Sequence, residues 1–282
     1  MTERIHGAVS ADGTGIAGRV QGNGPALVLV HGAIGDGDIA WEAVLPHLTG
    51  RFTCYLPSTR GRGLSSDNPD HSPERLEQDV TAFVESIGEP VSLVGWSGSG
   101  EWVLGVAARS RSVAAVAAYE PAVVSVMRES DRSRTVAVLE KMGTAAAEGR
   151  LVDAARTFAP WICNDDEIAA LEKTDFYERW AGRVPAMLRF LQADAAYEGP
   201  RSTDPEALGK VGVPVLLLRG EQTLLGDWFT DAAQHIARYV ADASVRELPD
   251  VGHFAPLVAP VALAEALVSF FASVGVTGLT AR

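Results

Sequence analysis

The sequence has few of the features that mark a secreted or membrane protein. It contains only two cysteines, Cys54 and Cys163, which are too few for a disulfide framework. Residues 1–13 lack the basic segment and the apolar segment of a secretory signal. The longest apolar runs, such as residues 26–30 and 213–218, have the length of a strand and are too short to cross a bilayer. We therefore expect a cytoplasmic protein with no membrane partner.

Positive charge is also scarce. Basic residues number 24 against 36 acidic ones, which gives a net charge of −12 and a pI near 4.9. The longest basic cluster is Arg60-Gly61-Arg62, whereas a protein that binds a phosphate backbone needs a basic stripe. We therefore expect no nucleic-acid partner. Only three of the basic residues are lysines, which is typical of a GC-rich bacterial genome.

Length and composition favour one large domain. With 282 residues, of which 47% are hydrophobic, the chain can bury a core that needs no disulfide or metal to hold it together. At this length we expect a single α/β domain with an insertion, and a homodimer remains open.

Short, continuous apolar runs alternate along the chain with stretches of helical periodicity. Continuous runs are typical of parallel strands that are buried on both faces. The expected strands cover residues 26–30, 52–56, 91–94, 113–119, 215–218 and 245–248. Helices are expected over residues 73–87, 99–109 and 260–273, the first of them opened by Ser72-Pro73. The alternation predicts an α/β fold with a doubly wound, mostly parallel central sheet flanked by helices.

One long segment interrupts this alternation. Residues 123–209 show helical periodicity and no convincing strand, so we predict a helical cap inserted after the strand that ends near Glu120. The expected division is a core of residues 1–122 and 210–282 with a cap of residues 123–209. Trp161 and Trp180 in the cap, together with Trp96, are candidates for an apolar substrate pocket at the carboxyl ends of the strands. Alternatively, the cap aromatics only pack the cap's own small core.

The sharpest motif is Gly95-Trp96-Ser97-Gly98-Ser99-Gly100, between an expected strand and an expected helix. A strand-to-helix turn this tight needs small residues on both sides of its apex. Ser97 at the apex then projects above the sheet, where a nucleophile is accessible. The motif resembles the nucleophile elbow G-x-S-x-G of the α/β-hydrolase superfamily, except that position 99 is Ser instead of Gly.

Two further motifs strengthen the resemblance. His31-Gly32-Ala33 follows the strand of residues 26–30, where the family places the first loop of its oxyanion hole. The resemblance makes the backbone N–H groups of Ala33 and Gly98 the oxyanion donors, with His31 as a structural residue. Residues 58–65 are similar to the family turn D-x-R-G-x-G-x-S, although Ser58 replaces the leading Asp.

The general base is expected near the C-terminus. His253 follows the last expected strand, in residues 248–254, and comes after Ser97 in the chain order that the superfamily requires. The resemblance to the superfamily extends over about residues 16–273 and implies no cofactor and no metal.

The acid of the catalytic triad is missing from its usual place. In the family it stands in a G-x-x-D turn, but here the turn that begins at Gly220 has Thr223 in the position of the Asp. Threonine cannot stabilise an imidazolium by charge. Glu120, at the carboxyl end of the preceding strand, is our preferred acid, since some members of the superfamily carry the acid there. Asp227 and Glu221 are the alternatives, and absence of any acid is left open.

These residues predict a cofactor-free serine hydrolase in which Ser97, His253 and Glu120 form the triad. The expected substrate is a small or medium apolar ester, lactone or thioester. A Ser at position 97 excludes epoxide hydrolases and haloalkane dehalogenases, which use an Asp nucleophile. Perhydrolases (cofactor-free haloperoxidases) and C–C bond hydrolases use the same triad and remain alternatives, as does a non-catalytic ligand receptor or scaffold on the same fold.

Overall fold

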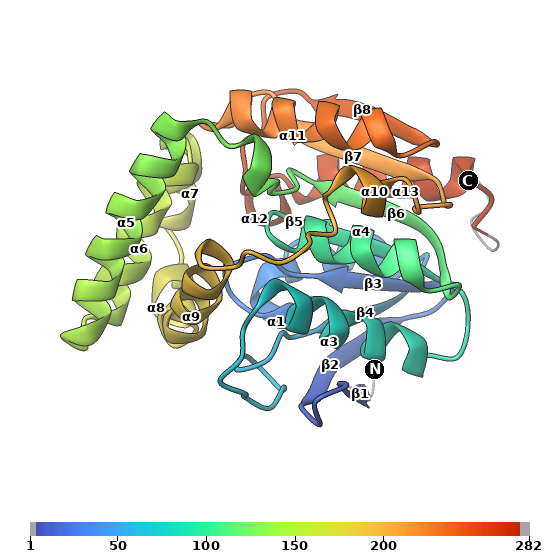
Figure 1. The fold of residues 1–282 in the computed structure, drawn as a ribbon, viewed down its shortest axis with the longest axis horizontal. Helices are drawn as coiled ribbons and strands as arrows, with labels where there is room; N and C mark the ends of the chain where they lie inside the picture. The colour runs from blue at the N-terminus through green and yellow to red at the C-terminus, as the bar shows by residue number, and fades with distance from the viewer. Residues whose placement is uncertain (1–3, 277–282) are drawn as a thin grey trace.

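The computed structural model describes residues 4–276, whose strands form one eight-stranded sheet in the order β1-β2-β4-β3-β5-β6-β7-β8 (Figure 1). The β1–β2 and β2–β4 pairs are antiparallel, and the remaining pairs are parallel. The strands are β1 (Arg4–Val9), β2 (Gly15–Gly22), β3 (Ala26–Val30), β4 (Thr53–Pro57), β5 (Val91–Trp96), β6 (Val113–Tyr119), β7 (Val215–Gly220) and β8 (Ala243–Leu248). The predicted mostly parallel sheet is confirmed.

Burial follows the apolar pattern of the strands. Every residue of β3 and β5 is buried, which explains why these strands read as continuous apolar runs. In β2, buried and partly buried residues alternate, as expected for a strand near the edge of the sheet. The sequence pattern did not predict β1 and β2, because their alternation is short and is diluted by glycine and charged residues.

Two groups of helices flank the sheet. The first group consists of α3 (Pro73–Ser86), α4 (Ser99–Arg109), α10 (Pro205–Leu208) and α11 (Gly226–Tyr239). Within this group, α4 contacts α3 and α10, and α10 also contacts α11. Helices α1 (Gly37–Trp41), α2 (Leu45–Leu48), α12 (Ala255–Val258) and α13 (Pro260–Ser273) form the second group, in which α13 contacts α2 and α12, and α12 contacts α1.

A helical segment joins β6 to β7. It contains a 3-10 turn, η1 (Val124–Val126), and helices α5 (Glu129–Ala147), α6 (Leu151–Ile162), α7 (Asp165–Leu171), α8 (Phe176–Ala181) and α9 (Val184–Ala195). These five helices gather at one side of the sheet (Figure 1), and we refer to α5–α9 as the cap. Helix α10 packs against α4 and α11 instead. The division of the chain at residues 123 and 209 stays a prediction.

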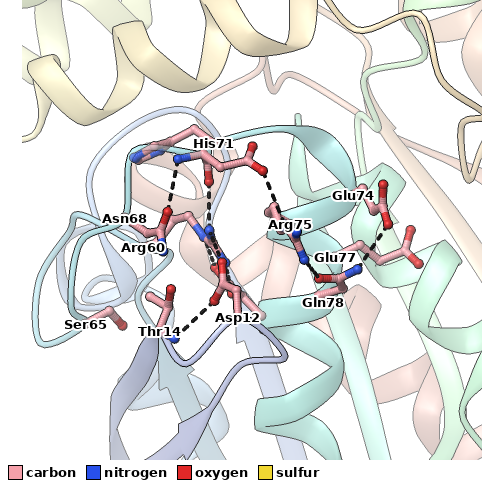
Figure 2. Close-up of polar contacts among 12 residues, drawn as sticks. Asp12, Thr14, Arg60, Ser65, Asn68, His71, Glu74, Arg75, Glu77 and Gln78 are labelled. Carbon is pink, nitrogen blue, oxygen red and sulfur yellow. Dashed lines mark hydrogen bonds and ion pairs between the residues drawn. The ribbon is translucent and has the colours of Figure 1, made fainter.

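The turn of residues 58–65 is anchored by a buried charge. Arg60 is fully buried, and its Nε and Nη2 donate to the carboxylate of Asp79 at 2.8 and 2.6 Å. Its Nη1 donates to Asp12 at 2.9 Å, and Asp12 also accepts from the backbone N–H of Thr14 (Figure 2). A buried charge is tolerated when it is paired and hydrogen-bonded in this way. Arg60 therefore ties the β1–β2 hairpin to α3.

Candidate active site

Ser97 lies at a strained turn between β5 and α4. Its φ of 59° is in the left-handed region, which a non-glycine residue rarely occupies. A Cβ at Gly95 would lie 2.9 Å from the carbonyl oxygen of Ser99, and one at Gly100 would lie 2.7 Å from the Cα of Pro121. The turn therefore depends on glycine at both positions, and it projects the Ser97 side chain away from the sheet.

Ser99 explains how this chain departs from the G-x-S-x-G pattern. Its hydroxyl is fully buried and donates to the carbonyl oxygen of Val30 in β3 at 2.7 Å. The hydroxyl oxygen of Ser99 in turn accepts from the backbone N–H of Trp96 at 2.8 Å. The larger side chain is therefore accommodated because its polar atom is satisfied, and it ties the turn to the neighbouring strand.

His253 and Glu120 meet beneath the cap. The Nδ1 of His253 lies 2.6 Å from Oε2 of Glu120, and both side chains are fully buried. Glu120 also accepts a hydrogen bond from the backbone N–H of Gly220 on Oε1 at 2.8 Å and one from the hydroxyl of Thr223 on Oε2 at 3.1 Å. A carboxylate beside Nδ1 fixes the tautomer with the proton on that nitrogen, so that Nε2 carries the lone pair.

The imidazole of His253 is held by its neighbours. The ring of Phe229 stacks on it at a centroid distance of 5.0 Å, and the indole Nε1 of Trp96 donates to its carbonyl oxygen at 3.0 Å. Its Nε2 is buried and has no hydrogen-bond partner among residues 4–276. His253 and Ser97 both line a small cavity of about 10 Å³, close to the space that one water molecule needs. An imidazole with an unpartnered nitrogen and a serine thus line the same small cavity.

The loop after β3 is rigidly supported. The buried side chain of Arg62 donates through Nη1 to the carbonyl oxygen of Ala33 at 2.8 Å and to those of Gly32 and Gly35 at 3.3 Å. The Nε2 of His31 accepts a hydrogen bond from the backbone N–H of Thr59 at 3.0 Å. Burial lowers the pKa of His31 to about 3. Its ring is therefore neutral and structural.

A larger cavity of about 410 Å³ opens between the core and the cap. Ser97, Ala33 and Gly98, the nucleophile and oxyanion donors predicted from the sequence, all line it. Most of the other lining side chains are apolar and come largely from the cap, and they include Val124, Met127, Val136, Leu139, Phe158, Trp161, Ile162, Phe190, Leu191 and Trp228. The cavity can enclose an organic molecule of modest size with one group at Ser97.

The three tryptophans selected from the sequence occupy different places. Trp161 lines the large cavity, whereas Trp96 lies deeper and lines the small cavity beside His253. Trp180 is fully buried inside the cap, where its ring packs against Phe158 and Phe176 at centroid distances of 5.8 and 5.7 Å. Trp180 thus packs the core of the cap, as the alternative reading of the sequence allowed.

The alternative acids lie elsewhere. The side chain of Asp227, at the start of α11, is 74% exposed and forms an ion pair with Arg128. Glu221 accepts a hydrogen bond from the backbone N–H of Asp250 at 3.1 Å. Of the acids considered from the sequence, Glu120 is the one that the structure brings to the imidazole of His253.

Glu167, in the cap helix α7, escaped the sequence analysis. Its Oε1 accepts from the backbone N–H of Phe254, the residue after His253, at 2.6 Å. Its Oε2 accepts from the backbone N–H of Asn164 at 3.1 Å, and the Asn164 side chain donates to the carbonyl oxygen of Gln222 at 3.1 Å. Burial raises the pKa of Glu167, and the charge of His253 acts against this rise. Helix α7 therefore links the cap to both loops around Glu120 and His253. The capping box of α7, Asn164 with Glu167, is the local signal that marks this residue.

The comparisons with known proteins agree with this fold. A family model described as Alpha/beta hydrolase family matches residues 27–266. The chain belongs to the alpha/beta hydrolase family. A pyrrolizixenacetamide deacetylase of Xenorhabdus hominickii is 36% identical over 95 residues, which cover 32% of this chain and 34% of that protein. An N-formylmaleamate deformylase of Pseudomonas putida is 35% identical over 94 residues, which cover 32% of this chain and 35% of that protein. Each match thus spans about a third of the relative's length.

Solved structures extend the similarity over nearly the whole chain. A thermophilic esterase from Thermogutta terrifontis superposes with a TM-score of 0.74 at 21% identity, covering 97% of this chain and 99% of that one. At this identity, the likeness concerns the fold alone. Within residues 4–276, none of the helices is both long enough and apolar enough to cross a bilayer.

Proposed function

We propose that this alpha/beta hydrolase is a cofactor-free serine hydrolase that cleaves a carboxylic ester, lactone or thioester. The observation that carries the proposal is the 2.6 Å contact of Glu120 with Nδ1 of His253, a residue that lines the same small cavity as Ser97. This arrangement has the order nucleophile, base, orienting acid that acyl transfer by serine needs.

In the first half of the reaction, Ser97 Oγ attacks the carbonyl carbon while Nε2 of His253 takes the hydroxyl proton. The carbonyl oxygen becomes an oxyanion, which accepts hydrogen bonds from the backbone N–H groups of Ala33 and Gly98. The carbon–oxygen or carbon–sulfur bond then breaks, and His253 returns the proton to the leaving alcohol or thiol. The product of this half is an acyl ester of Ser97.

In the second half, water attacks the acyl ester and His253 again takes a proton. The tetrahedral intermediate uses the same two N–H donors, and its collapse releases the carboxylic acid and restores the Ser97 hydroxyl. Glu120 keeps its charge throughout and stabilises the imidazolium that forms twice in each turnover. Burial of both groups strengthens this interaction, since little water screens it.

Amide hydrolysis is the second candidate. The matched relatives named as a deacetylase and a deformylase support it, and the same residues can cleave an amide if His253 protonates the leaving nitrogen. Perhydrolysis and C–C bond cleavage would use the same groups and have no separate support. A non-catalytic receptor would not need the buried Glu120–His253 pair beside Ser97, which disfavours that alternative.

The test is hydrolysis of p-nitrophenyl butyrate, with phenyl thiobutyrate, γ-butyrolactone and p-nitrobutyranilide as the other bond types. Wild-type protein should hydrolyse the ester, and Ser97→Ala should lose nearly all of this activity. Ser125→Ala is the matched control, since Ser125 also lines the large cavity but lies outside the strained turn. Hydrolysis that persists in Ser97→Ala, or a wild-type protein inert on all four substrates, would overturn the proposal.

A further inference from the structure

Four polar side chains of the large cavity come from α4, α9 and the segment after α9. Glu101 of α4, Asp194 of α9, and Tyr197 and Arg201 beyond α9 all line it, together with Ser97. Nη1 of Arg201 donates to Oε2 of Glu101 at 3.1 Å and to Oδ1 of Asp194 at 2.8 Å. Nη2 of Arg201 donates to the carbonyl oxygen of Asp194 at 2.8 Å. One guanidinium therefore serves two carboxyl groups, one turn along α4 from the nucleophile.

Glu101 is incompletely satisfied in this cluster. Glu101 is only 5% exposed, and its Oε1 is buried without a hydrogen-bond partner among residues 4–276. Burial raises the pKa of Glu101 to about 7, Arg201 and the backbone of Ser202 lower it, and Asp194 raises it further. An unsatisfied buried carboxyl oxygen is costly, so a ligand group that bonds to it would gain binding energy.

A second residue of the cavity wall, Trp161 of the cap, also has an unsatisfied polar atom. The indole Nε1 of Trp161 is buried and has no acceptor in the described part of the chain. Trp161 is only 8% exposed. Two residues of the cavity wall, one from the cap and one from the core, therefore each carry a buried polar atom without a partner among residues 4–276.

We propose that the substrate is amphiphilic and carries a neutral amide or hydroxyl group that binds to Glu101. This inference rests on the proposed hydrolytic function. An amide or a hydroxyl both donates and accepts hydrogen bonds, so it can satisfy Glu101 in either protonation state and can also accept from Trp161. A purely hydrocarbon substrate would leave both groups unsatisfied. A carboxylate at this position would add a third carboxyl group to Glu101 and Asp194, which already share the guanidinium of Arg201.

The test uses pairs of p-nitrophenyl alkanoates with and without a terminal carboxamide, over a range of chain lengths. A second series carries the carboxamide on the alcohol side of a butyrate ester, with the released acid followed by titration. In at least one series, wild-type protein should prefer the carboxamide in kcat/KM by about tenfold or more over the alkyl partner of the same length. The alkyl ester of each pair measures the hydrolytic activity without a carboxamide, so it is the reference for the carboxamide ester of the same length.

Three variants assign the preference to the residues named. Glu101→Leu should abolish the preference, Trp161→Phe should reduce it, and Glu101→Gln, which keeps an acceptor, should retain much of it. Glu140→Leu, which replaces an exposed carboxylate on α5, is the matched control and should keep the wild-type ratio.

The outcomes separate this inference from the proposed function. Hydrolysis of carboxamide and alkyl esters at equal efficiency in both series would overturn the inference and leave the hydrolase proposal intact. A preference that survives in Glu101→Leu would also overturn it. If no ester is cleaved and Ser97 fails to react with a fluorophosphonate, the proposed function fails and the inference fails with it.

Discussion

The hydroxyl of Thr223 donates a hydrogen bond to Oε2 of Glu120 over 3.1 Å. Thr223 stands where the family turn carries an Asp, in the loop after β7, and Glu120 follows the adjacent strand β6. Because β6 and β7 are parallel neighbours, their carboxyl ends meet at the same edge of the sheet. The carboxylate therefore reaches His253 from one strand away, and the residue at the usual acid position supports it.

Thr223 should contribute moderately to activity. Replacing it with valine keeps the shape of the side chain and removes the hydrogen bond to a buried carboxylate. We expect kcat to fall by about ten- to a hundredfold, since hydrogen bonds to charged groups contribute about 1.5–3 kcal/mol. Thr223→Ser keeps the hydroxyl and should retain activity near that of the wild type. An unchanged kcat in Thr223→Val would show that the hydrogen bond has no part in catalysis.

Because the side chains of Glu120 and Thr223 are in hydrogen-bond contact, we expect that either position can carry the acid of the triad. Glu120→Gln alone should reduce kcat by about 10³- to 10⁴-fold, since the imidazolium loses its charged partner. Adding Thr223→Asp to this variant places a carboxylate beside the same imidazole, and we expect at least a tenfold recovery, roughly 1.4 kcal/mol. Thr223→Asp in the wild-type background should be harmful, because it buries two carboxylates together. A double variant no more active than Glu120→Gln would contradict the shared position.

Local sequence patterns account for the core of the fold. Residues 26–30 and 113–119 form strands with the predicted bounds, because a parallel strand buried on both faces is a continuous apolar run. The pattern failed where neighbouring elements decide the outcome. Helical periodicity over residues 123–209 did not show that α8 and α9 are separate helices divided near Gly182, and the hairpin of β1 and β2 has no continuous apolar run.

The residues of the candidate site also differ in how far the local sequence identifies them. Ser97 could be selected because its turn imposes small neighbours within three residues along the chain. Glu120 could only be ranked among several carboxylates, because its contact with His253 spans 133 residues and depends on the pairing of β6 with β7. Glu167 could not be found, since its hydrogen bond to Phe254 depends on how the cap packs on the core.

Glu167 should tune the pH dependence of the reaction. Its buried carboxylate interacts with the charge of His253, so Glu167→Gln removes a negative charge that favours the imidazolium. Since the proposed reaction needs a free lone pair on Nε2 of His253, the acid limb of the pH profile of kcat/KM should move to lower pH. The amide oxygen of glutamine can still accept from Phe254, which preserves the loop.

Asp166→Asn is the matched control for this charge effect. Asp166 is the preceding residue in the same helix, its side chain is exposed, and the substitution removes the same charge. Its pH profile should overlay that of the wild type, because solvent screens the exposed carboxylate. An acid limb that moves equally in both variants, or in neither, would show that Glu167 has only a structural role.

His31 should make the fold sensitive to acid. In the folded chain burial lowers its pKa from 6.5 to about 3, so between these values the unfolded chain binds the extra proton. The free energy of unfolding must therefore fall as the pH falls below about 6.5, by about 2 kcal/mol at pH 5. Urea unfolding at pH 8 and pH 5 measures this loss. His31→Gln should lose less on acidification, whereas His47→Gln, at an exposed site, should match the wild type. An equal loss in His31→Gln would exclude His31 as its source.

The most direct test of the Ser97–His253–Glu120 assignment is the rate of fluorophosphonate labelling, followed by intact mass. Wild-type protein and Asp227→Asn should gain one adduct at the same rate, because the exposed Asp227 pairs with Arg128. Glu120→Gln should react more slowly by orders of magnitude, and Ser97→Ala should gain no adduct. Labelling that persists in Ser97→Ala, or that slows in Asp227→Asn and not in Glu120→Gln, would contradict the assignment.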